Sequence, residues 1–405
     1  MTVYYVLIVV VLIWQLLSLY LAKRHFFYVL KKYRSRPTTY HPRTALIAPC
    51  KGIDTAFERN VSALFELDYP DYEIVFVVES TSDPAYAVLS RLIEAQKNKN
   101  KSNSRLIVAG VTQHCSQKIH NLLAGWDVLD DEVEVLAFID SDVCPKAHWL
   151  ASLVAPLKRK SVGASTGYRL YVPIDFGLSS TVLSAVNALI ASTLGPHRLN
   201  AAWGGSMAIR KDIAERIQLR QAWQFAGTDD YTLTAAVKKS GLLIYYVPAC
   251  LVASYDQMSW PQLFSFATRQ FIITRVCMKP LWRLALLNFL WFVAVFWSSL
   301  FFMFHLLATG SADWLLAAVL PAVIAVVSAL KAAARQWLVM KILPEDRKRL
   351  VLPALIDIFC QPLLAVFTLV CLIASATTRK IVWRGVGYTL HSPTRAEIIH
   401  LSRGA

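Results

Sequence analysis

The sequence predicts an α/β domain with a mostly parallel sheet, joined at both ends to transmembrane helices. Between residues 44 and 275, short β-branched runs alternate with helical stretches, a pattern typical of parallel strands connected by crossover helices. Long uncharged apolar segments lie before and after this region. Charged residues make up 17% of the chain and the mean hydropathy is +0.43, whereas soluble globular chains are about 25% charged. This composition indicates a membrane protein.

Four apolar segments carry the excess, and each approaches the roughly 20 residues that a membrane-spanning helix needs. They are residues 3–21, 284–308, 314–330 and 352–374. The first has neither a basic segment before it nor a small-residue cleavage site after it, so we interpret it as a retained anchor. We therefore expect four regions. They are an N-terminal transmembrane anchor (1–24), a cytosolic α/β domain (40–280), C-terminal transmembrane or interfacial helices (281–378) and a basic C-terminal tail (379–405).

The distribution of Lys and Arg predicts the orientation of these segments. Lys23 and Arg24 follow the first apolar segment, which places the next domain in the cytosol. The loop 310–313 has no basic residue and is expected on the opposite side, whereas basic residues between 331 and 349 mark a return to the cytosol. We attribute the net charge of +15 mainly to cytosolic loops that face anionic lipid, and not to binding of nucleic acid.

The last apolar segment conflicts with this rule. If it spans the membrane, the basic tail lies on the non-cytosolic side. Pro353, Asp357, Gln361 and Pro362 interrupt the segment, so a re-entrant or interfacial hairpin is the alternative.

The α/β region has the size of one domain. Strands are expected at 44–48, 73–78, 105–109, 135–139 and 162–164, helices at 211–218 and 229–239, and a last strand at 243–247. Pro248 is expected to end that last strand, because proline cannot donate to the hydrogen-bond ladder.

The most informative motif is Asp140-Ser141-Asp142, which directly follows the apolar run 135–139. Open α/β sheets bind ligands at the carboxyl ends of their strands. Carboxylates at this spacing suit Mg²⁺ or Mn²⁺, and such an ion can neutralise a diphosphate. The alternative is an Asp-rich turn after a strand.

Other strand and helix ends carry candidate donor-binding residues. Lys51 follows the first strand and Glu79 follows the second. At such a position a carboxylate can accept hydrogen bonds from a nucleotide base or ribose. The alternative is that Glu79 is an ordinary acidic loop residue. Lys118 opens a helix, where a lysine can hold phosphate, although a solvated lysine is an equal alternative.

Two further motifs lie later in the domain. Trp203 offers an aromatic face and Gly205 a flexible backbone beside it, a combination that suits the binding of a sugar. The alternative is that these residues form a β-bulge. Asp229 and Asp230 are adjacent acids at a helix start. One of them can cap the helix, and the second is typical of a general base.

Taken together, these motifs resemble the family 2 glycosyltransferases, and most closely the ceramide glucosyltransferase-like branch. The ordered set comprises 51–54 (KGID), 65–73 (FELDYPDYE), 83–85 (DPA), 118–122 (KIHNL), 140–142 (DSD), 205–207 (GSM) and 229–231 (DDY). The resemblance covers nearly the whole chain, because apolar anchors also precede and follow the motifs. It implies a nucleotide-diphosphosugar transferase (GT-A) fold and inverting transfer from a UDP-sugar to a lipid at the cytosolic face.

The resemblance also implies roles for individual residues. Glu79 takes the place of an aspartate that contacts the nucleotide. Asp140 and Asp142 match the acids that hold a Mg²⁺ or Mn²⁺ diphosphate, with Asp142 as the direct ligand. Asp230 matches the catalytic base that deprotonates the acceptor hydroxyl, and Asp229 stands where the family has glutamate.

One motif departs from the family pattern of Gln or Arg, two residues, Arg and Trp. Arg269 fits its first position, but Ile272 and Ile273 replace the Arg and Trp. We expect Arg269, Gln270 and Arg275 to supply the diphosphate contacts from a shifted register.

The acceptor is expected to be a hydroxylated lipid such as ceramide, a hopanoid or diacylglycerol. Residues 176–194 and 260–271 are apolar enough to contact the lipid, although both also suit core helices. Transfer to polyprenyl phosphate or a polysaccharide is a second hypothesis. A non-catalytic scaffold is a third, which the acids Asp140, Asp142 and Asp230 disfavour.

Overall fold

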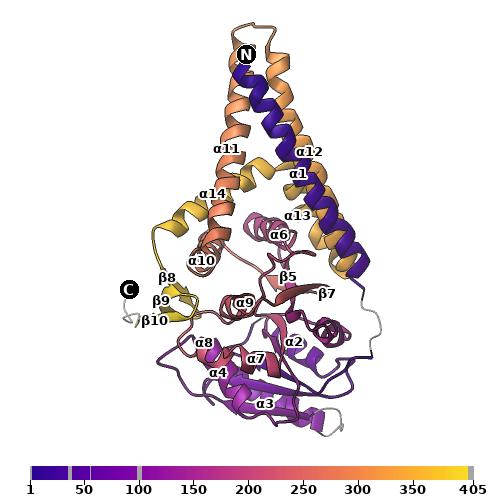
Figure 1. Cartoon of the computed structure of the whole chain (residues 1–405), viewed down its shortest axis with the longest axis vertical. Helices are drawn as coiled ribbons and strands as arrows, with labels where there is room; N and C mark the ends of the chain where they lie inside the picture. Colours follow the sequence, from indigo (N-terminus) through magenta and orange to yellow (C-terminus); the bar gives the residue numbers. More distant parts are fainter. Residues whose placement is uncertain (1, 35–38, 55, 98–102, 400–405) are drawn as a thin grey trace.

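The computed structural model describes residues 2–34, 39–54, 56–97 and 103–399. A stalk of three long helices rises from a globular body, and a layer of shorter helices lies between them (Figure 1). The stalk consists of α1 (Thr2–Lys32), α11 (Lys279–Ala308) and α12 (Trp314–Ile342). All three are long and apolar enough to cross a membrane, so the expectation of an integral membrane protein is met.

Helix α12 continues beyond the predicted end at residue 330, because its polar side chains have partners inside the helix bundle. The ammonium of Lys331 donates to the Ser18 hydroxyl of α1 at 2.8 Å. One turn later, Arg335 forms two hydrogen bonds with Asp357, at 2.7 and 2.9 Å. The basic residues that were expected to follow the membrane segment therefore belong to the helix itself.

The last apolar segment is broken and does not run straight. A short 3₁₀ turn (η2, Pro344–Asp346) leads into α13 (Arg347–Phe359), and α14 (Gln361–Ala376) follows at an angle of 88°. The Asp357 carboxylate, which is fully buried, also accepts hydrogen bonds from Gln336 and Gln361. The geometry fits the bent hairpin better than a straight span.

The globular body contains a seven-stranded sheet in the order β3-β2-β1-β4-β6-β5-β7. Its strands are β1 (Thr44–Pro49), β2 (Tyr72–Val78), β3 (Asn103–Val108), β4 (Val135–Ile139), β5 (Val162–Pro173), β6 (Ser206–Arg210) and β7 (Leu243–Asp256). Strands β3, β2, β1 and β4 are parallel, and β6 runs antiparallel to β4 and β5. The prediction of a mostly parallel sheet is confirmed.

Helices cover both faces of this sheet and bury two apolar clusters. One face packs on α2 (Phe57–Leu64), α3 (Pro84–Lys97), α5 (Trp149–Val154) and the 3₁₀ helix η1 (Ala155–Lys158); the other packs on α4 (Gln117–Asp127), α7 (Lys211–Arg216), α8 (Leu219–Trp223) and α9 (Asp229–Lys239). Strand β4 is buried at every position, which explains why its sequence is uniformly apolar.

Strand β7 corrects one prediction, because Pro248 does not end it. The pairing of β5 with β7 shifts register between Thr166, opposite Tyr246, and Tyr168, opposite Leu251. Pro248 falls in this irregularity, where proline is tolerated inside a sheet because no ladder hydrogen bond is required of it. Both strands consequently run much further than predicted.

Two helices lie between the sheet and the stalk. Helix α6 (Leu178–Ala191) is buried over most of its length, so it is a core helix. Phe176, two residues before its start, is 78% exposed. Helix α10 (Trp260–Cys277) exposes Trp260 and Phe264 while it buries Leu263 and Ala267. Of the two segments considered for lipid contact, α10 therefore presents aromatic side chains along its first turns.

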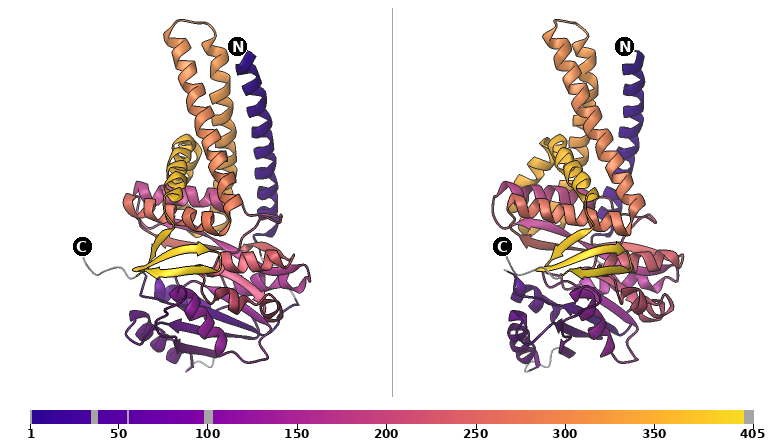
Figure 2. Two further views of the ribbon diagram at one scale, coloured as in Figure 1. Left: turned by 60° about the vertical axis from the view of Figure 1, so that its left-hand side comes forward. Right: turned by 90° about the vertical axis from the view of Figure 1, so that its left-hand side faces the viewer.

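The segment expected to be a basic tail is folded. Strands β8 (Lys380–Trp383), β9 (Val386–Ser392) and β10 (Arg395–Ile399) form an antiparallel sheet. In both further views this sheet lies beside α10 and against helices of the globular body (Figure 2). Ala396 N–H donates to the Phe225 carbonyl at 2.7 Å, so the sheet is docked on the body.

Candidate active site

One edge of the sheet collects most of the candidate residues. Strands β1, β2 and β4 are parallel, so the residues that follow them meet at this edge. Strand β6 is antiparallel, with Ser206 opposite Ile139, so the residues that precede it lie at the same edge. Lys51, Glu79, Asp140, Asp142 and Trp203 thereby converge from separate parts of the chain, as open α/β sheets require for a ligand site.

Lys118 and two carboxylates form the centre of the site. Helix α4 begins at Gln117 with Ser116 as its N-cap, and the Lys118 ammonium lies 2.7 Å from Asp140 and 3.1 Å from Asp229. Burial disfavours the charged ammonium, but the carboxylates of Asp140, Asp229 and Asp230 outweigh it and raise the pKa of Lys118. Lys118 is therefore a buried charge between two acids and not a solvated lysine.

The same ion pairing keeps Asp140 ionised. Burial by itself raises the pKa of Asp140, but the positive charges of Lys118 and Arg169 outweigh it, so the pKa lies below its usual value. For Asp229, burial outweighs the attraction of Lys118, and the pKa is raised. The site thus holds acids of differing proton affinity within reach of one cation.

Asp230 has the environment of a general base. Its carboxylate accepts hydrogen bonds from Tyr231 N–H at 2.7 Å and from Gly204 N–H at 3.3 Å. Burial raises the pKa of Asp230 to about 7, and the neighbouring charge of Asp229 acts in the same direction. A carboxylate with a pKa near neutrality binds a proton well enough to take it from a hydroxyl.

The Trp203–Gly205 turn lies directly against these acids. A Cβ on Gly204 would lie 2.2 Å from Asp229 Oδ2 and 2.7 Å from Lys118 Nζ, so only glycine fits at this close approach. A Cβ on Gly205 would meet the Trp203 ring at 2.2 Å. The Trp203 ring itself stands edge-on to Tyr168.

Arg169 is a site residue that the sequence analysis missed. It donates to Asp142 at 2.9 Å, and its guanidinium lies over the rings of Trp203 and Tyr171, 5.0 and 5.1 Å from their centroids. The available signal was an arginine between two tyrosines in an apolar run, which became interpretable only once β5 was seen to extend to Pro173.

Lys51 and Glu79 form an ion pair of 2.7 Å, each about a quarter exposed. Arg269, Gln270 and Arg275 lie on α10. Burial lowers the pKa of Arg269, and the charges of Arg169 and Arg384, which are near enough to act on it, help to lower it further. The guanidinium of Arg269 donates to the Val382 carbonyl at 2.9 Å, and that of Arg275 donates to the Thr378 carbonyl. The two arginines hold the C-terminal segment, and the diphosphate role expected for these three residues stays a prediction.

Arg384 is the second residue that the sequence analysis missed. It occupies the turn between β8 and β9 and binds both oxygens of Asp54, at 2.9 and 3.1 Å. Asp54 belongs to the segment that follows β1. The signal was Gly385 between two short runs rich in β-branched and aromatic residues, which fits a hairpin turn and which the assignment of this region to a tail concealed.

The acidic pair also bears on the expected metal. Among the residues that the structure describes, no cluster of three or more His, Cys, Asp or Glu side chains is arranged to hold an ion. Asp142 Oδ1 is nevertheless buried without a hydrogen-bond partner, while Oδ2 is paired with Arg169. A single free carboxylate oxygen fits an ion that takes its other ligands from a diphosphate and water.

Comparison with known proteins places these features in context. The sequence profile of Glycosyl transferase family 21 matches residues 3–396. A ceramide glucosyltransferase from Komagataella phaffii (strain GS115 / ATCC 20864) is 28% identical over 162 residues, which cover 38% of this chain and 31% of that enzyme. The match therefore spans about a third of the relative's length.

The fold also matches that of a solved structure. A mannosyltransferase, PcManGT from Pyrobaculum calidifontis, in complex with GDP-Man and Mn²⁺, superposes with a TM-score of 0.50 at 18% identity. The superposition covers 89% of this chain and 93% of that one. The predicted GT-A fold is confirmed.

Proposed function

The chain belongs to glycosyl transferase family 21, and from this premise we propose that it transfers a sugar from a UDP-sugar to a hydroxylated lipid such as ceramide. The observation that carries the proposal is the buried Asp230, with its pKa raised to about 7 beside the Lys118–Asp140 ion pair. A general base beside charged residues at the carboxyl ends of the strands is the arrangement that sugar transfer with proton abstraction requires.

The reaction is a single inverting displacement. Asp230 takes the proton of the acceptor hydroxyl, whose oxygen forms a bond to the anomeric carbon. The bond between that carbon and the diphosphate oxygen breaks on the opposite side, and UDP leaves with the electron pair. Lys118 and Arg169 lie beside the acids and attract the leaving group, since charge stabilisation in a buried site is strong.

Asp142 is the residue we assign to the divalent cation, Mg²⁺ or Mn²⁺, through its free Oδ1. The bound cation supplies Lewis-acid stabilisation of the diphosphate. Mn²⁺ accompanies GDP-Man in the solved mannosyltransferase, which supports a metal-dependent donor site. Asp140 supports this arrangement from its ion pair with Lys118, and Glu79 and Lys51 are assigned to the nucleotide.

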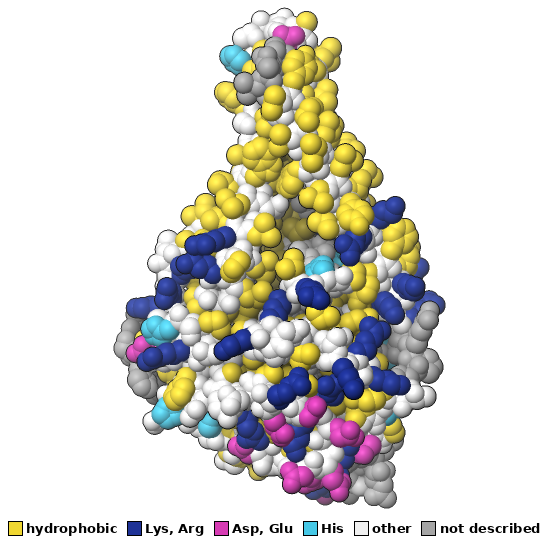
Figure 3. All heavy atoms as spheres, in the orientation of Figure 1, with side chains coloured by type: hydrophobic (Ala, Val, Ile, Leu, Met, Phe, Trp, Pro, Cys, Tyr) yellow, Lys and Arg dark blue, Asp and Glu magenta, His cyan; other side chains and the backbone are white. Residues whose placement is uncertain are grey.

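The stalk gives the lipid acceptor a route that does not leave the membrane. Hydrophobic side chains cover the stalk, Lys and Arg gather where it meets the body, and acidic side chains gather at the far end of the body (Figure 3). Basic residues beside membrane segments favour the cytosolic side, so the body is proposed to face the cytosol. The exposed Trp260 and Phe264 of α10 then lie at the interface with the bilayer.

Purified full-length protein in detergent, with Mg²⁺ or Mn²⁺, total lipid extract and a panel of radiolabelled nucleotide sugars, tests this function. Label in the organic phase with the wild type, and none with Asp230→Asn, is expected. Label that instead enters a water-soluble polymer contradicts the lipid acceptor. Absence of any transfer, together with absence of metal-dependent UDP binding, contradicts the enzymatic assignment.

The variant Asp142→Ala tests the role of the donor site independently of the role of the base. We expect it to lose metal-dependent UDP binding, because the free carboxylate oxygen is removed, whereas Asp230→Asn retains that binding. If both variants bind UDP with wild-type affinity, Asp142 is not the metal ligand.

A further inference from the structure

We propose that the β8–β9 hairpin is a cap over the donor site and that Arg384, at its turn, contacts the diphosphate of the nucleotide sugar. This inference rests on the proposed function and adds a donor-binding residue to it.

The turn of the hairpin is built around Arg384. Trp383 pairs with Val386, so only Arg384 and Gly385 form the loop, and both have left-handed backbone, with φ of 49° and 79°. Such two-residue turns favour Asn, Asp or Gly at both positions. A long side chain with positive φ is uncommon and carries a strain of about 1 kcal/mol. Strain of this kind points to a role for the side chain.

The arginine is held at the edge of the sheet that carries the acids. Asp54, which follows β1, takes two of its five N–H donors. In the described part of the chain the other three donors have no hydrogen-bond partner. The positive charge of Arg384 also contributes to lowering the pKa of Asp140, after the stronger effects of Lys118 and Arg169. A guanidinium so placed matches a phosphate, which it can bind with two parallel hydrogen bonds.

Ile272 and Ile273, which replace the Arg and Trp of the family motif, form the seat of the hairpin. Both are buried in one apolar cluster with Ile381, Tyr388 and Leu390 of the C-terminal sheet. An Arg at position 272 would place a charge in this cluster. The apolar pair on α10 therefore seats the hairpin and fixes where its turn lies on the body.

Polar contacts also hold the C-terminal sheet β8–β10 against α10, α9 and α4. Arg269 and Arg275 hold the backbone at Val382 and Thr378 from α10. The Thr232 hydroxyl of α9, two residues after Asp230, donates to the Pro393 carbonyl. Tyr388 accepts at its hydroxyl from Gln117 N–H, beside Lys118. The cap is thus tied to the helices that carry the base and the central cation.

The test compares Arg384→Gln and Arg384→Lys with Arg395→Gln, an exposed arginine of the same small sheet. Sugar transfer, UDP binding by calorimetry and thermal melting are measured for each full-length variant. We expect Arg384→Gln to lower kcat/KM for the donor by about 100-fold or more, as loss of one charge-stabilising donor does. Arg384→Lys should recover part of the activity, and Arg395→Gln should stay within about twofold of the wild type.

The outcomes separate this inference from the proposed function. If Arg384→Gln transfers sugar and binds UDP like the wild type, the inference is wrong and the proposed function stands. If the variant loses activity only with a lowered melting temperature that Arg384→Lys also shows, Arg384 is structural and the inference is again wrong. If the wild type itself transfers no sugar, the proposed function fails first.

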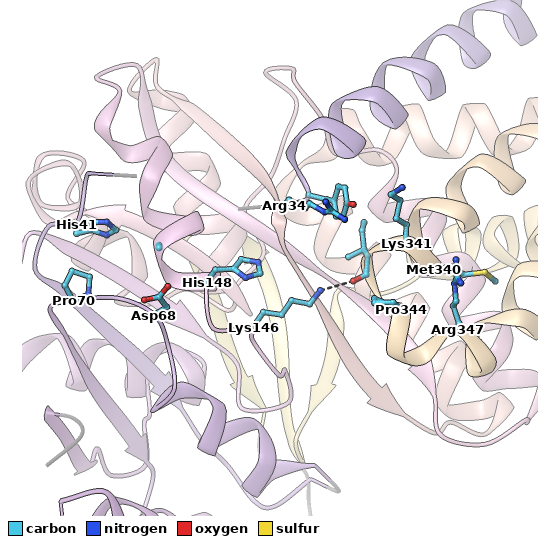
Figure 4. A pocket seen from close by; sticks show the side chains of 13 residues that line it. Arg34, His41, Asp68, Pro70, Lys146, His148, Met340, Lys341, Pro344 and Arg347 are labelled. Atoms are coloured by element: carbon cyan, nitrogen blue, oxygen red, sulfur yellow. Dashed lines mark hydrogen bonds between the residues drawn. The ribbon is translucent and has the colours of Figure 1, made fainter. Parts of the chain in front are cut away.

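A separate cavity carries a second inference. A space of about 1120 Å³ lies where α1 and α12 leave the stalk, and it is lined by residues from both helix ends and from the body (Figure 4). Four described lining residues are cationic and one is acidic: Arg34, Lys146, Lys341, Arg347 and Asp68. We infer that this basic cavity binds a phosphate group, supplied by the headgroup of an anionic lipid.

The position of the cavity supports a lipid as the source. Lys341 belongs to the last turn of α12 and Arg34 lies two residues after the end of α1, so both lie near the ends of these helices. Lys146 is anchored by donating to the Ile342 carbonyl at 2.8 Å, and His148 lies beside it in the lining. Basic pockets between membrane helices on the cytosolic side are suited to anionic headgroups.

Native mass spectrometry of the full-length protein with phosphatidylglycerol, phosphatidylcholine or inorganic phosphate tests this site. Retention of phosphatidylglycerol by the wild type, reduced at least about tenfold in Lys341→Gln/Arg347→Gln, is expected. The charge-matched control Lys239→Gln/Lys348→Gln, outside the cavity, should bind normally. Equal loss in both double variants, or equal retention of phosphatidylcholine, overturns the inference. Competition by inorganic phosphate alone, without lipid retention, overturns the lipid source.

Discussion

Lys118 and Asp140 form an ion pair of 2.7 Å although they come from different helix and strand ends, and the same ammonium lies 3.1 Å from Asp229. Lys118 therefore acts on the charge of both acids that lie beside the proposed base. Because Lys118 also lowers the pKa of Asp230 against the effects of burial and Asp229, the pH dependence of the reaction should depend on Lys118.

We expect kcat/KM to rise with pH and to level off above an apparent pKa near 7, because Asp230 must lose its proton to act as a base. In Lys118→Gln this limb should move to higher pH, since the variant lacks the charge that favours the ionised carboxylate. Rates of sugar transfer between pH 5 and 9 measure this. Lys239→Gln, at the exposed end of α9, is the control, and an unshifted limb in Lys118→Gln contradicts the role given to this lysine.

Asp230→Asn should be inactive and yet gain stability relative to the wild type as the pH rises. The folded-state pKa of Asp230, about 7, lies above its ordinary value of 3.8. The folded protein therefore binds this proton more tightly than the unfolded chain, and stability is lost as the pH rises through about 7. Melting temperatures of both proteins at pH 5 and pH 8.5 test this. The melting temperature of Asp230→Asn minus that of the wild type should be higher at pH 8.5 than at pH 5, and a lower value at pH 8.5 contradicts the prediction.

Gly204→Ala should lower sugar transfer by about 100-fold, since displacements of about 1 Å in a site have effects of this size. The added Cβ would lie 2.2 Å from Asp229 and 2.7 Å from Lys118, so the pair must separate. Gly195→Ala is the matched control, because its Cβ meets only His197, at 3.4 Å. Wild-type kinetics in Gly204→Ala would show that the turn accommodates a Cβ without displacing Asp229 or Lys118, which contradicts this prediction.

Asp357→Ala should destabilise the bent helix pair by about 3 kcal/mol or more, because it leaves Arg335 buried without its partner. The Asp357 carboxylate is fully buried and also accepts from Gln336 and Gln361. Thermal melting in detergent measures the loss. Arg335→Met/Asp357→Leu removes both charges and should melt closer to the wild type than Asp357→Ala does.

Local sequence patterns were sufficient to predict a strand or helix where its surroundings are the same along its whole length. The residues 135–139 are apolar throughout because β4 is buried on both faces, and α9 covers 229–239 as predicted. Pro248 misled the prediction because its tolerance depends on a register shift with β5, a contact far away in the sequence. Arg169 and Arg384 stayed hidden for the same reason: each acquires its meaning from a partner, Asp142 or Asp54, that only the tertiary structure brings near.

The docking of β8–β10 has a consequence for biosynthesis. Lys118, Asp140 and Asp230 are translated before the second and third stalk helices, whereas Arg384 is translated after every membrane segment and after the bend at Asp357. The seven-stranded sheet is complete in the chain before these helices are made, whereas β8–β10 can dock only after α13 and α14 have been synthesised. The proposed donor site is therefore completed last, and a chain in which α13 and α14 fail to pack is expected to be synthesised and anchored by α1 but inactive.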